Sequence, residues 1–180
     1  MTFLELIRHR QSVRAYSDRP VEKEKIERCL EAARLAPSAC NSQPWRFIIV
    51  DDKELKDRIA RETIGPVISF NHFSFKAPIL VIAVLEPSNL TARFGNMRQK
   101  IQFNLLDLGI AAEHFCLQAA EDGLGTCMLG WFKEEPVKKI LGIPRGKKVA
   151  LIITLGYAET DEIRPKKRKS LKEIYGENEY

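Results

Sequence analysis

Residues 77–85 read APILVIAVL, the longest apolar run in the chain. The run begins with alanine and proline and stays apolar throughout, which is typical of a strand covered by protein on both faces. A membrane-spanning helix needs roughly 20 apolar residues, so this run is far too short to cross a bilayer. We therefore predict that residues 77–85 form a central strand and expect no association with a membrane.

Helical and strand patterns surround this run without strict alternation. The other predicted strands are 47–50, 126–129 and 149–157. One predicted helix begins at Thr2, and the other predicted helices cover 26–33, 55–59, 97–121 and 134–141. The order strand, helix, strand over residues 126–157 favours a crossover connection. We predict an α+β fold in which helices surround one central mixed sheet.

The helix expected at 97–121 is apolar on more than one face. Ile101 and Leu105 follow one face, whereas Leu106 and Ile110 make another face apolar. An apolar helix face in water is a liability, so this helix needs protein around it. Either the helix lies at the centre of a large core, or its apolar faces contact a second copy of the chain.

The composition is that of an ordinary globular protein. Of 180 residues, 44% are hydrophobic and 29% are charged. A chain of this length can bury one good core, whereas two smaller domains would each be marginally stable. We therefore expect a single domain over residues 1–180, with a basic tail from about residue 159. Acidic Glu5 stands where a signal peptide would be apolar, so we expect a cytoplasmic protein.

The four cysteines and three histidines show no spacing typical of a metal site or of a disulfide framework. Cys29, Cys116 and Cys127 occupy apolar positions of predicted elements and are expected in the core. Cys40 lies in a polar loop, and the pattern assigns it no role. We predict free thiols and no bound metal.

Two glycine-rich stretches fail the patterns of nucleotide-binding loops. In GLGTCMLG, residues 123–130, Met128 occupies the position of the third glycine of the dinucleotide fingerprint. In GIPRGK, residues 142–147, the glycines are too close for a P-loop and no strand precedes them. Neither ATP nor a nucleotide bound in the Rossmann manner is expected.

Residues 8–20, RHRQSVRAYSDRP, carry four arginines near the N-terminus. Such a cluster can be solvated, bind nucleic acid or form a pocket for one anionic group. The chain has 24 acidic residues among its basic ones and no nucleic-acid-binding motif, so nucleic acid is disfavoured. In an extended segment Arg10, Ser12 and Arg14 point the same way and offer two guanidinium groups and a hydroxyl, which suits phosphate.

Five motifs, in order along nearly the whole chain, resemble the nitroreductase family of FMN-dependent oxidoreductases. They are RQSVRAY at 10–16, APSACNSQPWRF at 36–47, DLGIAAEHFCLQA at 107–119, GLGTCMLGWF at 123–132 and ITLGYA at 153–158. The basic tail follows them. The resemblance implies a nitroreductase-like α+β fold, an intertwined homodimer, and FMN in a cleft at the dimer interface.

The resemblance also implies contacts with FMN, position by position. Arg10, Ser12 and Arg14 would hold the phosphate, the ribityl chain and the pyrimidine edge, with Gln11 contributing through its backbone. The other implied contacts are Pro37, Ser38, Ala39 and Asn41 from the second subunit, Asn71 at the pyrimidine, Leu129 and Gly130 beside the ring, and Lys166 and Arg168 at the phosphate.

The activity that the resemblance implies is reduction of nitroaromatics, quinones or related acceptors by NADH or NADPH. Hydride would pass through flavin N5 in a ping-pong scheme, with no catalytic side chain, because the cofactor carries the chemistry. The protein could instead be a specialised relative, such as a dehalogenase or a flavin-fragmenting enzyme, or a non-catalytic flavin-binding redox module. Trp131 and Phe132 either line the opening of the site or pack in the core.

Overall fold

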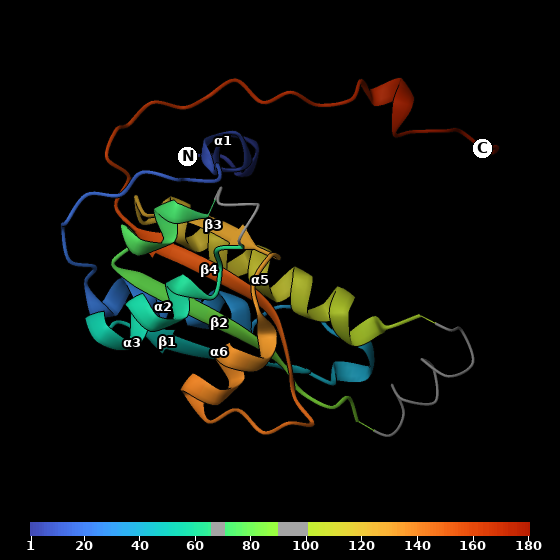
Figure 1. Ribbon diagram of the computed structural model, residues 1–180. Coiled ribbons are helices and arrows are strands. Elements are labelled where there is room, and N and C mark those ends of the chain that lie inside the picture. The colour runs from blue at the N-terminus through green and yellow to red at the C-terminus, as the bar shows by residue number, and fades with distance from the viewer. Residues whose placement is uncertain (66–70, 90–100) are drawn as a thin grey trace.

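The computed structural model describes residues 1–65, 71–89 and 101–180 and contains a four-stranded sheet covered by helices (Figure 1). The strands are β1 (Trp45–Val50), β2 (Ile79–Leu85), β3 (Gly125–Leu129) and β4 (Lys148–Gly156), in the spatial order β1-β2-β4-β3. β2 is an internal strand and is buried from Ile79 to Val84. The prediction of a central strand at this run is therefore confirmed.

The three pairings between these strands are all antiparallel, so the predicted mixed sheet was wrong in this respect. β3 and β4 are direct neighbours, and the helix α6 (Glu134–Leu141) joins them without a crossover. A Glu134 carboxylate oxygen accepts a hydrogen bond from Val149 N at 2.9 Å, which holds the start of α6 beside the start of β4. Within the described residues, parallel pairing is limited to an isolated bridge between Ser12 and Thr126.

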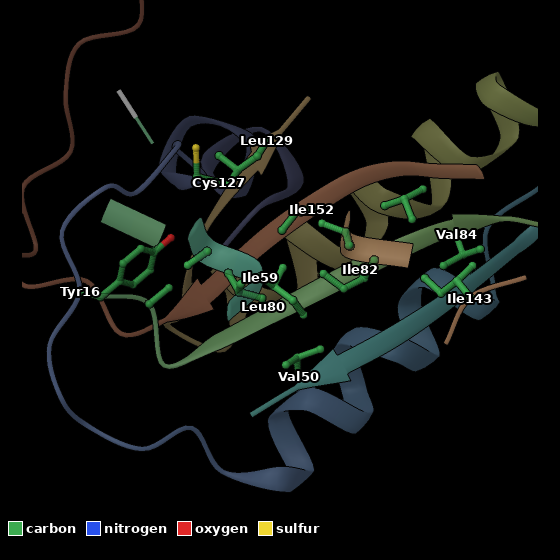
Figure 2. Packing of buried hydrophobic residues seen from close by; sticks show 14 of the residues in the cluster. Tyr16, Val50, Ile59, Leu80, Ile82, Val84, Cys127, Leu129, Ile143 and Ile152 are labelled. Atoms are coloured by element: carbon green, nitrogen blue, oxygen red, sulfur yellow. The ribbon is translucent and has the colours of Figure 1, made fainter. Parts of the chain in front are cut away.

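Side chains that alternate along β2 divide the core into two layers. The remaining helices are α1 (Phe3–His9), α2 (Lys23–Arg34), α3 (Lys53–Arg61) and α5 (Phe103–Glu121), with short 3₁₀ turns η1 (Ala39–Asn41), η2 (His72–Phe75) and η3 (Leu171–Glu173). Ile79 and Val81 belong to the layer that includes residues of α2 and α5. Leu80 and Ile82 belong to the other layer, together with Ile59 of α3 (Figure 2).

α5 is the long apolar helix of the sequence, but it begins at Phe103 rather than at residue 97. Residues 97–100 of the predicted helix lie outside the described residues. One side of α5 is in the core, where Phe115 is fully buried, whereas Leu106 and Ile110 are 57% and 39% exposed. Across the ranges described, no helix combines the length and apolar character required to cross a membrane.

The N-terminal segment lies along the edge strand β3. α1 begins with a capping box, in which Glu5 N donates to Thr2 Oγ1 at 3.3 Å. Farther along, Val13 N donates to Thr126 O at 2.8 Å. A Cβ atom on Gly125 would lie 2.6 Å from Val13 Cγ2, so glycine is required for this close approach.

The four cysteines are free. Cys29, Cys116 and Cys127 are buried, as predicted, and Cys40 is exposed. Burial raises the pKa of Cys29 and of Cys116 to about 12, so both stay protonated at neutral pH.

Candidate functional site

A basic groove lies where the N-terminal segment meets the C-terminal tail. It is lined by Arg10, Gln11, Ser12, Arg14 and residues 164–168. The cationic lining residues are Arg10, Arg14, Arg164, Lys166, Lys167 and Arg168, and no residue in this lining is acidic. The groove therefore has a strongly positive potential and suits an anionic ligand.

Lys166 fastens the tail to the end of α1. Its Nζ donates to the carbonyl oxygens of Arg10 and of Ile7, the latter at 2.5 Å. Partial burial lowers the pKa of Lys166, and the positive charges of Arg10 and Arg168 lower it further. The cations that the sequence assigned to one site from opposite ends of the chain thus lie together.

Arg164 makes a second attachment that the sequence did not single out. Its Nε donates to Gln11 Oε1 at 3.1 Å, and its guanidinium also donates to the carbonyl oxygen of Ser12. Gln11 Nε2 in turn donates to Glu162 O at 2.7 Å. The only signal in the sequence was the arginine's place at the start of the basic tail.

Arg10 and Arg14 are oriented by different contacts. Arg10 Nε lies 3.3 Å from a carboxylate oxygen of Glu113 on α5. The Arg14 guanidinium lies over the ring of Phe73, 5.9 Å from its centroid. Both arginines and Ser12 line the same groove, as their alternation in the sequence suggested.

Asn71, Leu129 and Gly130 do not line the basic groove. Asn71 is buried, and its Nδ2 donates to Thr63 O at 3.2 Å and to Trp131 O at 3.1 Å. These two bonds use both hydrogens of the amide, so Asn71 has only its oxygen left to offer a ligand, as an acceptor. Trp131, whose carbonyl oxygen accepts one of these bonds, is 54% exposed.

The predicted contacts Pro37, Ser38, Ala39 and Asn41 lie on a loop outside the lining of the basic groove. The loop is closed by a hydrogen bond from Gln43 N to Ser38 Oγ at 2.9 Å. A single copy of the chain therefore does not bring this loop to the groove.

The sequence profile of the nitroreductase family matches residues 7–71 and 69–157. The chain belongs to the nitroreductase family. The chain is similar to a solved FMN-dependent nitroreductase from Clostridium difficile, with a TM-score of 0.81 and 27% identity over 99% of this chain and 100% of the other. The match confirms the predicted α+β fold class.

Two curated relatives widen the comparison. The chain is 29% identical over 177 residues to the oxygen-insensitive NADPH nitroreductase of Helicobacter pylori, over 81% of each chain. It is also 27% identical over 197 residues to iodotyrosine deiodinase 1 of Mus musculus, over 96% of this chain and 68% of the relative. Family membership confirms the predicted class, an FMN-dependent oxidoreductase that uses NADH or NADPH.

Proposed function

We propose that the protein binds FMN in the basic groove and uses NADH or NADPH to reduce nitroaromatics, quinones or related acceptors. The observation that carries the proposal is the groove itself, where cations from both ends of the chain meet with no acidic residue in the lining. FMN is a phosphate monoester and carries close to two negative charges on its phosphate at neutral pH. The cationic donors of the groove suit this phosphate group. The whole chain would act as one FMN-binding domain.

In this proposal Arg10, Lys166 and Arg168 bind the phosphate, with the Ser12 hydroxyl and the Gln11 backbone as further donors. Arg14, which also lines the groove, binds the pyrimidine edge, where its charge favours the anionic reduced form. FMN, when bound, supplies hydride acceptance and delivery at N5, and the two substrates use it in turn in a ping-pong scheme. The protein contributes binding, orientation and electrostatics, and no side chain is assigned as a general base.

The ring of FMN would be enclosed by a second copy of the chain. Apolar residues that the single chain leaves exposed fit an intertwined homodimer; they include Phe3, Leu4, Leu106, Ile110, Leu171 and Ile174. The last two belong to the tail, which extends away from the body of the molecule (Figure 1). Leu171 and Ile174 are exposed in the single chain.

In the dimer the loop of one subunit would supply Pro37, Ser38, Ala39 and Asn41 to the FMN of the other. Leu129 and Gly130 at the end of β3 would lie beside the ring, with a backbone N–H near N5. The Asn71 oxygen would accept from the pyrimidine, because both of its amide hydrogens are already used.

A reductive dehalogenase is the second candidate function, and the similarity to iodotyrosine deiodinase 1 favours it. No comparable observation supports a flavin-fragmenting enzyme or a redox module without turnover. The deciding difference between the two candidates is the acceptor: a nitro group or quinone for the first, a carbon–halogen bond for the second.

The test is a flavin spectrum of the purified protein, followed by anaerobic addition of NADH or NADPH. We expect a yellow protein whose visible absorbance is bleached by the nucleotide and restored by a nitroaromatic or a quinone. Restoration by a halogenated phenol alone favours the dehalogenase. A colourless protein that does not take up added FMN overturns the proposal, and bleaching that never occurs leaves only the redox module.

A further inference from the structure

A buried carboxylate on α5 contacts the loop that follows α2. Asp107 is 5% exposed, and its Oδ1 accepts a hydrogen bond from Ala39 N at 3.0 Å. Its Oδ2 is buried and has no hydrogen-bond partner among the described residues. Burying a carboxylate with one unpaired oxygen costs free energy, which indicates that the buried Asp107 has a specific role.

The loop that Asp107 contacts has an unusual backbone. Cys40, Asn41 and Gln43 have φ values of 51°, 49° and 47°, in the left-handed region that residues with a side chain rarely adopt. Such conformations persist only where surrounding contacts hold them. Ala39, which begins η1, is the point where the buried helix reaches this backbone.

We propose that Asp107 is a positioning residue that sets the shape of loop 38–43 through the Ala39 N–H. It does not line the basic groove. The inference rests on the proposed function, in which this loop covers the FMN ring of the partner. By tying the loop to the buried core, Asp107 would hold Ser38, Ala39 and Asn41 in one geometry before the cofactor binds, which lowers the entropic cost of binding.

The proposal is tested on the loop and on FMN separately. Hydrogen–deuterium exchange of the peptide covering residues 36–44 is measured in flavin-free protein, and FMN affinity is measured by fluorescence titration. Asp107→Ala removes the acceptor, and Asp107→Asn keeps an oxygen that can accept from Ala39 N. Gln118→Ala is the matched control, because it removes a 3.3 Å hydrogen bond between the same helix and Asp122, far from the loop in sequence.

We expect Asp107→Ala to speed exchange of this peptide about tenfold and to weaken FMN binding about tenfold, the effect of losing one hydrogen bond to a charged group. Asp107→Asn should stay within about threefold of the wild type on both measures, since the acceptor is retained. Gln118→Ala should leave the peptide unchanged. If the alanine variant does not fold, Asp107→Ser, whose hydroxyl is too short to reach Ala39 N, takes its place.

Unchanged exchange of residues 36–44 in the alanine or serine variant overturns the proposal. Equal losses in the alanine and asparagine variants overturn the acceptor role, and equal losses in Gln118→Ala show general damage to α5 instead. Because exchange is followed without flavin, a wild-type protein that binds no FMN refutes the proposed function and leaves the loop result readable. Faster exchange without weaker FMN binding overturns the link between the loop and the cofactor.

Discussion

Lys166 donates a hydrogen bond to the carbonyl oxygen of Arg10 across 156 positions of sequence. The contact joins the basic tail to the arginine-rich segment after α1, and both segments line one groove. Each segment alone is a modest cluster of exposed charge. Their contact brings together a set of cationic donors that suits a phosphate group.

Replacing Lys166 with methionine should release the tail while keeping an apolar stem of similar length. We expect faster amide exchange over residues 160–170, because the bonds to Ile7 and Arg10 are lost. Lys169→Met is the control, since Lys169 is exposed and lies outside the groove lining. Equal exchange in the two variants would show that Lys166 does not fasten the tail.

Arg10→Ala should weaken FMN binding by roughly tenfold to a hundredfold, the loss of charge-assisted hydrogen bonds to a phosphate. Arg8→Ala and Arg19→Ala should change the affinity by about twofold at most, because exposed charges outside the site contribute little. Arg19 instead pairs with Glu22 at 2.9 Å. Fluorescence titration of FMN at fixed ionic strength measures all three, and equal losses would mean a general charged surface rather than a site.

Gly125→Ala should destabilise the fold by about 1–3 kcal/mol, because the new methyl group meets the Val13 side chain. The same change should weaken FMN binding, since Val13 lies between two residues that line the groove. The additional change Val13→Ala should restore part of the lost stability. Gly146→Ala is the control, with open space around its Cβ position, and chemical denaturation with FMN titration distinguishes the variants.

Glu22→Gln should lower the stability of the fold at neutral pH, and this loss of stability should become smaller as the pH falls. The Tyr157 hydroxyl donates to the Glu22 carboxylate at 2.6 Å, and this bond, with help from Arg19, lowers the pKa of Glu22 from 4.5 to about 2. A carboxyl whose pKa is lowered by folding adds stability above its unfolded pKa and loses it as pH falls through the folded value. The difference in Tm between wild type and variant should therefore shrink from pH 6 to pH 2.5. A difference that is constant with pH would show that the carboxylate charge is irrelevant.

Cys40 should react with a thiol reagent in the native protein before the other three cysteines do. It is exposed, whereas Cys29, Cys116 and Cys127 are buried. Burial raises the pKa of each of these three thiols, which keeps the reactive thiolate scarce. Titration of native and unfolded protein, with Cys40→Ser as control, measures the order. Rapid labelling of the serine variant would contradict the packing described.

Local patterns in the sequence located most of the secondary structure. The strand at 77–85, the helix that begins near Thr2 and the helix at 134–141 each follow from interactions within a few residues. Order and spacing of motifs were also enough to indicate the family, which the profile match confirms. These features are legible because the physics that produces them acts between near neighbours.

The direction of the strands, the start of α5 and the second attachment of the tail through Arg164 were not legible in this way. They depend on which distant segments pack together, and a periodic pattern shows that a face is buried without showing what covers it. The sequence alone was sufficient to predict the central strand, the helices from their apolar periodicity, and the residue types that suit binding of an anion. Only the tertiary structure shows that Lys166 and Arg164 contact the segment after α1 and that Asp107 accepts a hydrogen bond from Ala39 N. These contacts exist only once the whole core has formed.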